Sequence, residues 1–394
     1  MPAPARELAD IFRRHGPAYR QAHSLPLHQH KLMRAIETCR TPAMGASVEW
    51  CDHCQYTHIQ YRSCRNRHCP KCQGLARAQW LEKRKAELLP VEYFHLVFTL
   101  PEPIANLAFY NKEVIYEILF RATAETLLTI ALDPKYLGVQ AGFFAVLHTW
   151  GQNLHFHPHL HCVVPGGGLS PDHPRWIPGR RRFFLPVRVL SALFRRLFVD
   201  AVKKAYAQNK LRFFGALEAL RDPQTFAAFL APLKNSPWVV YAKAPFGGPQ
   251  YVLEYLGRYT HRVAISNHRL LALDDGQVSF QWKDYRDRNQ QKVMTVAAEE
   301  FIRRFLQHAL PSGFQRIRYY GFLANCHRAE RLELCRQLLA PCSDLLPRPA
   351  PCRDLNAALT ASMLRLCPQC RIGTLWRFLV PPPQLALPPR LDTS

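Results

Sequence analysis

The segment His155-Phe-His-Pro-His-Leu-His161 holds several metal-ligating side chains in a short run. If this segment forms a β-strand, alternate residues share one face, so His157, His159 and His161 point the same way. Leu160 would then be buried behind them. Imidazoles two residues apart on a rigid strand can bind one divalent cation. A surface run of histidines is the alternative, but so many imidazoles in a basic chain favour a metal site.

Further along the chain, tyrosines recur every four residues at Tyr251, Tyr255 and Tyr259. On a helix they would form one stripe, which in many proteins is simply part of the core. Here Arg258 and Arg262 lie among and beyond the tyrosines, and arginines can clamp a phosphodiester. A phenol with a pKa of about 10 is a poor nucleophile at neutral pH. It needs a cation on the phosphate and a neighbour for its proton, and the histidine strand could supply the cation.

Two Cys-x-x-Cys pairs precede these segments, at Cys51-Asp-His-Cys54 and Cys69-Pro-Lys-Cys72. Two such knuckles can place four thiolates tetrahedrally around Zn²⁺, so a four-cysteine zinc site is expected here. Other possible ligands are close enough in the sequence to substitute for one of the four or to form a second site: Cys64, His53, His58 and His68. A set of reduced, buried cysteines is the plainer alternative.

A third pair, Cys367-Pro-Gln-Cys370, is followed by Gly373 and resembles another knuckle. No partner pair is evident for it. Cys342 and Cys352 are candidates, although their spacing is loose. The pair indicates a possible second structural metal.

The overall charge points to a polyanionic partner. The chain has 394 residues, with 52 Lys and Arg against 29 Asp and Glu, and a formal net charge of +23. Nucleic acid is the leading candidate, because each phosphate contact made by Lys or Arg releases counterions. A basic loop ends in Arg180, Arg181 and Arg182, which are candidate DNA contacts. A basic surface kept for solubility is the alternative.

No apolar run approaches the ~20 residues needed to span a bilayer, and the N-terminus lacks the pattern of a secretory signal. The expected setting is therefore the cytoplasm, with no membrane partner. In that reducing compartment the 13 cysteines favour metal binding over disulfides.

Hydrophobic periodicity indicates the elements that must position these side chains. Helices are expected at residues 1–40, 76–89, 104–132, 190–206, 250–262 and 297–309. Strands are expected at residues 93–100, 142–150, 154–164 and 238–242, with a hairpin over 263–282 around Asp275-Gly276. Helices and strands alternate without a regular βαβ period, so the predicted fold class is α+β.

Several motifs together resemble a known family. His159-Leu-His161 after a strand and Tyr255-x-x-x-Tyr259 on a helix resemble the HUH nucleases. Over most of its length the chain resembles more closely the insertion-sequence-ninety-one family of rolling-circle transposases. The motifs that carry this resemblance are the N-terminal knuckles, Ser63-Cys-Arg-Asn-Arg-His-Cys-Pro-Lys-Cys72, Phe98-Thr-Leu-Pro101, His157-Pro-His-Leu-His-Cys-Val-Val-Pro-Gly-Gly-Gly168 and Tyr255-Leu-Gly-Arg-Tyr-Thr-His-Arg-Val-Ala-Ile265. Taken together these motifs are highly specific, whereas the HUH pair alone would be weak.

The resemblance implies an HUH-type catalytic domain, with a central antiparallel sheet flanked by helices, and an N-terminal zinc-ribbon-like module. The expected parts are a helical region over residues 1–45, the zinc-binding module over 46–80, the catalytic domain over 85–325 and a Cys/Pro-rich tail over 326–394. The histidines would lie on a middle strand, with the tyrosine helix packed beside them.

The resemblance also implies metal-dependent cleavage of single-stranded DNA at an element end. The nucleophiles of the family fall on Tyr255 and Tyr259, and its histidine ligands for Mg²⁺ or Mn²⁺ fall on His159 and His161. HUH sites commonly take a third ligand from elsewhere, for which His157 and His261 are both candidates. Attack by one tyrosine would give a 5′-phosphotyrosine and a free 3′-OH, and the second tyrosine could receive the other end.

Three other classes of protein compete with this interpretation. A plasmid-type replication initiator or a relaxase would use the same chemistry, but the N-terminal zinc module favours a transposase. A non-enzymatic zinc DNA-binding protein would use the histidines and tyrosines only as core residues, and metal-dependent nicking would distinguish it. A transposase with a catalytic acidic triad is the last, and the sequence has no convincing triad of that kind.

Overall fold

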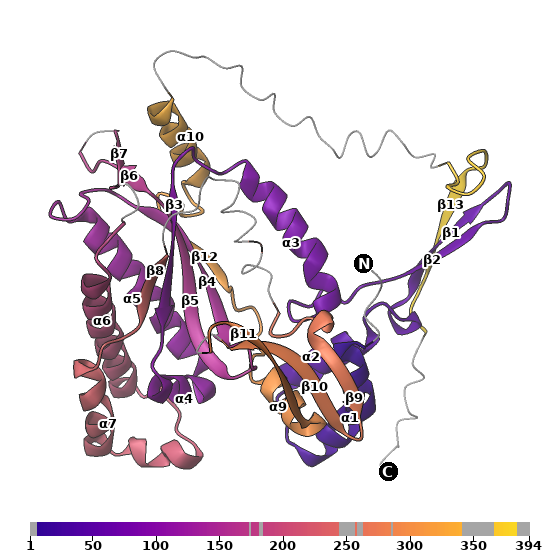
Figure 1. Ribbon diagram of the computed structural model, residues 1–394, viewed down its shortest axis with the longest axis horizontal. Helices are drawn as coiled ribbons and strands as arrows, with labels where there is room; N and C mark the ends of the chain where they lie inside the picture. The colour runs from indigo at the N-terminus through magenta and orange to yellow at the C-terminus, as the bar shows by residue number, and fades with distance from the viewer. Residues whose placement is uncertain are drawn as a thin grey trace, which may run out of the picture. The chain divides into compact units, whose positions relative to one another are not determined.

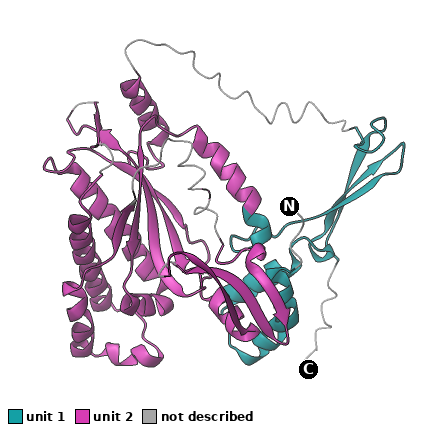
Figure 2. Ribbon diagram, in the orientation of Figure 1, with its two compact units in different colours: residues 1–73, 341–394 teal, residues 74–340 magenta. Residues whose placement is uncertain are grey.

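The computed structural model describes residues 6–172, 175–180, 184–243, 257, 263–284, 287–340 and 366–383. The chain divides into two compact units (Figure 2). One comprises residues 1–73 with 341–394, and the other comprises residues 74–340. Among the described residues, no helix is long and apolar enough to cross a membrane.

The larger unit is built on a five-stranded antiparallel sheet with the strand order β12-β4-β5-β3-β8 (Figure 1). The strands are β3 (Tyr93–Thr99), β4 (Gly142–Trp150), β5 (Phe156–Pro165), β8 (Val240–Lys243) and β12 (Ile317–Gly321). The histidine strand β5 is therefore the central strand, hydrogen-bonded to β4 on one side and to β3 on the other. This confirms the α+β class, the antiparallel sheet and the strand expected over residues 154–164.

Helices cover one face of this sheet (Figure 1). They are α4 (Glu102–Tyr110), α5 (Lys112–Leu132), α6 (Val187–Ala207) and α7 (Pro223–Asn235). Their apolar sides join the inward residues of the strands, such as Leu160 and Phe98, in the main core. The single helical stretch expected over residues 104–132 is broken at Asn111, whose side chain donates to Leu107 O and accepts from Arg212 N.

The opposite face of the sheet is partly covered by α3 (Pro70–Lys85). Trp80 of this helix packs against Phe144 of β4, with ring centroids 5.8 Å apart. Arg84 donates to the hydroxyl of Tyr319 on β12 at 2.9 Å. This helix starts earlier than the expected residue 76, because Pro70 occupies its first position, where a missing N–H costs nothing.

A second sheet of the larger unit has the order β11-β10-β9. Its strands are β9 (Leu270–Asp274), β10 (Gln277–Asp284) and β11 (Gln290–Ala297), and α9 (Ala298–Leu306) follows them. Asp275 and Gly276 have φ values of 49° and 72°, as a two-residue turn between antiparallel strands requires. The expected hairpin around these two residues is thus confirmed.

The smaller unit joins the two ends of the chain. Its helices are α1 (Leu8–Ala22) and α2 (Leu27–Thr38), and its sheet has the order β13-β1-β2. The strands are β1 (Ala46–Cys51), β2 (Thr57–Tyr61) and β13 (Leu375–Val380). Strand β13 pairs with β1 along its whole length, from Ala46↔Val380 to Cys51↔Leu375.

The expectation of a separate tail over residues 326–394 was therefore wrong in two places. Residues 328–339 form helix α10 (Arg328–Leu339) within the larger unit. Residues 375–380 complete the sheet of the smaller unit. Cross-strand pairing of the two chain ends is the physical reason, and local sequence patterns do not reveal it.

Candidate metal centres

Three histidines come together on the face of the large sheet that lies opposite its helical layer. They are His148 of β4 and His159 and His161 of β5, and one ring nitrogen from each lies within 4.8 Å of the others. His148 stands directly opposite His159 in the strand register. His148 and His161 are buried, with 2% and 8% of their surfaces exposed, and His159 is half-buried.

The ring nitrogens of His159 and His161 converge. Nε2 of His159 lies 3.1 Å from Nε2 of His161. Two nitrogens bound about 90° apart, at about 2.1 Å from one ion, would lie about 3.0 Å from each other. Nδ1 of His159 donates to the carbonyl of His157 at 2.6 Å, which leaves its Nε2 lone pair facing the cluster.

A fourth histidine, on the neighbouring strand, orients His161. Nε2 of His95, on β3, lies 2.8 Å from Nδ1 of His161, and the two rings are stacked with centroids 5.0 Å apart. With Nδ1 of His161 donating to His95, Nε2 of His161 carries the lone pair that a cation would bind. Hydrogen bonding of the far nitrogen is how proteins orient histidine ligands. The three imidazoles thus fit a divalent metal ion.

The structure corrects the choice of a third histidine. His157 shares the expected face with His159, but it is exposed and is not one of the three convergent residues. Desolvation and the charge of His155 lower the pKa of His157. Among the described residues the third member of the cluster is His148, whose position opposite His159 on the neighbouring strand could have been inferred only from the strand register. The other candidate, His261, lies outside the described residues.

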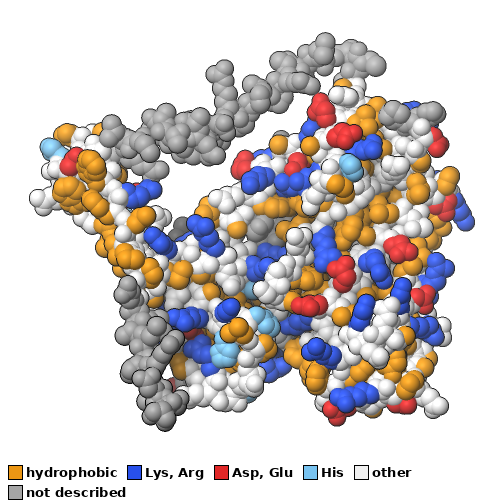
Figure 3. All heavy atoms as spheres, turned by 180° about the vertical axis from the view of Figure 1, so that it is seen from behind, with side chains coloured by type: hydrophobic (Ala, Val, Ile, Leu, Met, Phe, Trp, Pro, Cys, Tyr) orange, Lys and Arg blue, Asp and Glu red, His pale blue; other side chains and the backbone are white. Residues whose placement is uncertain are grey.

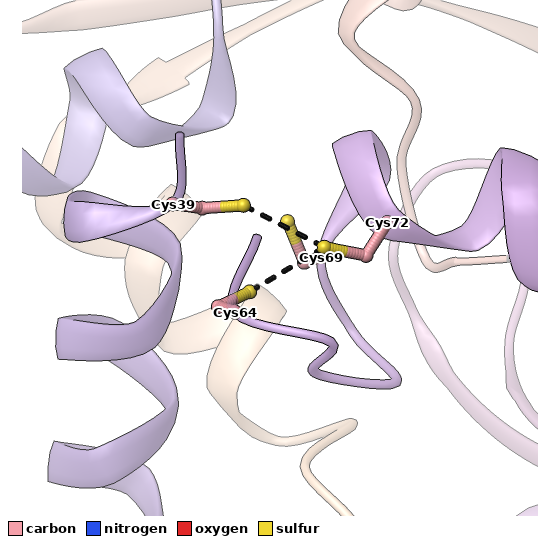
Figure 4. Close-up of side chains that lie close together, drawn as sticks. All are labelled: Cys39, Cys64, Cys69 and Cys72. Atoms are coloured by element: carbon pink, nitrogen blue, oxygen red, sulfur yellow. Dashed lines mark hydrogen bonds between the residues drawn. The ribbon is translucent and has the colours of Figure 1, made fainter. Parts of the chain in front are cut away.

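The cysteines form two groups of four rather than the single expected group. The first group is Cys39, Cys64, Cys69 and Cys72, whose side chains converge in Figure 4. Sγ of Cys72 lies 3.5 Å from Sγ of Cys39 and 3.6 Å from Sγ of Cys64. Four sulfurs held about 2.3 Å from a tetrahedral Zn²⁺ lie about 3.8 Å apart, so the spacing fits this ion.

The second group is Cys51, Cys54, Cys367 and Cys370. The Sγ atoms of Cys51 and Cys370 lie 3.7 Å apart, and those of Cys54 and Cys367 lie 3.6 Å apart. The backbone N–H groups of Gly373 and Ile372 lower the pKa of Cys370 to about 6, which favours the thiolate that a metal binds. A Cβ at Gly373 would lie 2.6 Å from Sγ of Cys51, so only glycine fits there.

The expected tetrad of Cys51, Cys54, Cys69 and Cys72 was therefore wrong in its pairing, because pairing of β1 with β13 brings Cys367 and Cys370 to the first knuckle. Cys64 is a member of the first group, as the sequence allowed. His68 is buried but belongs to neither group. Cys39, at the end of α2, was not among the candidates because no second cysteine lies near it in the sequence.

The remaining predicted residues divide between described and undescribed parts of the chain. Tyr251, Tyr255, Arg258, Tyr259 and Arg262 lie outside the described residues, as do Arg181 and Arg182. Arg180 is exposed and follows β7 (Trp176–Pro178). The N–H of Gly179 donates to the carbonyl of Gly166, just beyond β5, so Arg180 adjoins the end of this strand that is remote from His159.

Two families of known proteins match the chain over ranges that contain most of the clustered cysteines and the three histidines. Residues 11–100 match the family described as "Transposase zinc-binding domain", and residues 142–331 match the family described as "Putative transposase". The first match includes six of the eight clustered cysteines, all but Cys367 and Cys370, and extends well beyond the expected module of residues 46–80. The second includes the three convergent histidines.

Two relatives are similar over most of the chain. The sequence is 59% identical over 373 residues to the putative transposase y4qJ of Sinorhizobium fredii, covering 94% of each protein. It is 29% identical over 290 residues to the transposase for insertion sequence element IS801 of Pseudomonas savastanoi pv. phaseolicola, covering 73% of this chain and 68% of that one. No solved structure matches the chain.

A zinc-binding domain joined to a transposase region defines a DNA transposase. The chain belongs to the insertion-sequence-ninety-one family of transposases, with an N-terminal zinc-binding domain. The two cysteine clusters and this domain support structural zinc.

The two clusters predict the zinc content of the protein. We expect the purified chain to hold two equivalents of zinc, one in each group of four cysteines. Cys367→Ser combined with Cys370→Ser should reduce this to one equivalent, as measured by mass spectrometry of the metal. Cys326→Ser, at an exposed cysteine outside both clusters, should keep two. A single equivalent in the unmodified protein, or two in the double variant, would contradict the assignment.

Proposed function

We propose that this transposase nicks and rejoins single-stranded DNA at the element ends through a 5′-phosphotyrosine intermediate, in rolling-circle transposition within the nucleoid. The convergence of His148, His159 and His161 on one face of a rigid sheet carries the proposal, together with membership of the family. Such a set of neutral imidazoles is a ready ligand for a divalent cation. The proposal includes that the catalytic domain is of the HUH type.

The three histidines would hold the catalytic ion. When bound, the ion would polarise the scissile phosphate and stabilise the charge that develops on it. An all-imidazole set suits Mn²⁺ better than Mg²⁺, because Mg²⁺ prefers oxygen ligands. His95 would act as a positioning residue, since it touches His161 and not the substrate. Trp150, stacked on His148 with centroids 4.9 Å apart, would fix the third ring.

The position of Gly257 supports the assignment of the tyrosines. This residue lies midway between Tyr255 and Tyr259 in the sequence, and it is buried. A Cβ built on it would lie 2.8 Å from Leu81 and 3.0 Å from Arg77, so its backbone lies close against α3. Because α3 packs on the histidine-bearing face of the sheet through Trp80, Gly257 itself lies against a helix that covers this face.

The proposed reaction needs no external energy. The phenolic oxygen of one tyrosine attacks the phosphorus, the P–O3′ bond breaks, and the phenolic proton is transferred to the leaving 3′ oxygen. The phosphodiester is thus replaced by a phosphotyrosyl bond of similar energy, and a 3′-OH can reverse the step to rejoin the DNA. Arg258 and Arg262 would clamp the phosphate. A second tyrosine allows one DNA end to be held while the other is cut.

The basic surface would hold the remainder of the strand. Lys and Arg side chains are spread over the face drawn in Figure 3 and are more numerous there than Asp and Glu. With a net charge of +23, the protein should bind DNA with an affinity that falls steeply as salt rises. Binding and cleavage should therefore be separable by mutation.

The three-histidine site predicts the binding of Mn²⁺ itself. Mn²⁺ binding can be measured by electron paramagnetic resonance in the absence of DNA. His148→Ala should weaken this binding by at least as much as His95→Phe does. His95→Phe should weaken it by about 10- to 100-fold, the usual effect of losing a partner that orients a ligand. His268→Ala, at an exposed histidine outside the site, is the matched control. Unchanged Mn²⁺ binding in His148→Ala would rule out this ligand set.

Removing both His159 and His161 should abolish cleavage. His159→Ala combined with His161→Ala should lower the rate on labelled single-stranded element ends by ~10³-fold or more, since metal-ion stabilisation of the transition state amounts to several kcal/mol. Binding of the same DNA should change little, and should keep its salt dependence. Full cleavage by the double variant would disprove the catalytic role of this site.

The proposed nucleophiles can be tested by removing their attacking oxygens. Tyr255→Phe combined with Tyr259→Phe should eliminate the covalent DNA adduct, because phenylalanine retains the ring and lacks the attacking oxygen. Each single change should leave some first-strand cleavage and impair complete transposition, whereas Tyr251→Phe should be nearly silent. The measurement is a denaturing gel followed by peptide mapping. An adduct that persists in the double variant, or that maps to Tyr251, would show that other residues are the nucleophiles.

A further inference from the structure

A second concave site lies at the start of β5, within the larger unit. Its cavity has a volume of about 560 Å³. The rings of Phe109, Tyr110 and Phe214 line it, together with Arg303 and Arg304. We call it the ring pocket. A cavity of this size is typical of sites for small organic groups.

Two of the aromatic side chains are unusually exposed. Tyr110 and Phe214 have 44% and 46% of their surfaces accessible, and their ring centroids lie 5.6 Å apart. Phe109 meets Tyr110 edge to face at 5.0 Å. Rings this exposed contribute little to the core, and nearly half of each residue's surface is available to contact a flat partner. Stacking of bases on such rings is the usual means of binding single-stranded nucleic acid without sequence preference.

The arginines make the wall of the ring pocket positive. Both Arg303 and Arg304 donate to the carboxylate of Glu300, at 2.6 Å in each case. These bonds lower the pKa of Glu300 to about 2, so it is ionised at neutral pH. One carboxylate between two guanidinium groups leaves a net positive charge. The pocket therefore offers both stacking surfaces and charge that is complementary to a nucleotide.

The loop that forms the other wall is held firmly in place. Leu154 has a φ of 61°, a left-handed conformation that is costly for leucine. Its carbonyl accepts from Nε2 of Gln307 at 3.0 Å and from Nε2 of His308 at 3.1 Å. Lys112 in turn donates to the carbonyl of Gln307 at 2.7 Å, and so holds the residue that bonds this loop. Backbone strain that is maintained by so many bonds is typical of a binding site.

The ring pocket adjoins the histidine site along the chain. Its lining includes His155 and Phe156, which directly precede His157. From His155 to His159 is four residues of extended chain, or about 13 Å. A DNA strand with one phosphate at the three histidines would have a nearby nucleotide within reach of the ring pocket. The exposed amide of Asn106, also in the lining, offers a donor and an acceptor to a base edge.

We propose that the ring pocket binds an unstacked base of single-stranded DNA flanking the cleavage position. Its location beside the cut rests on the proposed function, but base binding itself does not. The pocket would hold the strand by stacking on Tyr110 and Phe214, while the arginines contact the adjoining phosphates. It would therefore help to place the scissile phosphate against the histidines and to exclude duplex DNA, whose bases are already stacked.

The test compares two probes of equal length and charge: an oligothymidylate and an abasic strand. Binding to the full-length protein is measured by fluorescence anisotropy without divalent metal, so that no cleavage occurs. The unmodified protein should prefer the oligothymidylate by about 5- to 100-fold, the range expected for stacking of a base on an aromatic ring. Phe214→Leu and Tyr110→Leu should each reduce this preference and leave binding of the abasic strand unchanged.

The controls separate stacking from folding. Phe214→Tyr keeps a ring at this position and should retain the preference, and Tyr136→Ala removes a ring outside the pocket and should also retain it. Equal binding of both probes by the unmodified protein would overturn the proposal, as would a preference that survives loss of both pocket rings. Neither result would contradict the proposed cleavage chemistry. Conversely, a base preference in a protein that forms no tyrosyl adduct would leave the pocket standing while the proposed function failed.

Discussion

The pairing of β5 with strands on both sides is the constraint on which the larger unit depends. Because side chains alternate along a strand, the register of β5 determines both which side chains enter the core and which lie on the opposite face of the sheet. Leu160, Cys162 and Val164 enter the main core, while His159 and His161 face the other way. A shift of one residue would bury the imidazoles and expose the core residues. The apolar core and the metal site are therefore consequences of the same register, and the stability of one maintains the geometry of the other.

The histidine site also depends on its neighbours in the sheet. His148 comes from β4 and His95 from β3, so the three central strands each contribute an imidazole. Flexible loops would not keep ring nitrogens within hydrogen-bonding distance in this way, whereas strands locked on both sides do. The ring pocket is built differently. It lies where the β4–β5 loop meets α4 and α9, and its shape depends on hydrogen bonds to loop carbonyls rather than on strand pairing.

The features that could be predicted from the sequence are those that depend on residues close together in the chain. The alternation of β5, the hairpin at Asp275-Gly276 and the Cys-x-x-Cys knuckles are local patterns, and the sequence predicted all of them. The third histidine and the partners of each knuckle depend on strands that are far apart in the chain. Cys39 has no cysteine near it in the sequence, and Cys367 meets Cys54 only because β13 pairs with β1. Local spacing therefore favoured a single tetrad, when the pairing of the chain ends produces two.

The second cysteine cluster sets an order of events during synthesis. Cys51 and Cys54 leave the ribosome early, but their partners Cys367 and Cys370 are translated some 300 residues later. At the usual ~5–20 residues per second, the first knuckle waits roughly 15–60 s before its site can be completed. Until then it can hold a metal only with two thiolates and water, or with borrowed ligands. A chain cut short before Cys370 never completes this cluster, so a transposase in which the cluster is complete is one whose translation has passed that residue.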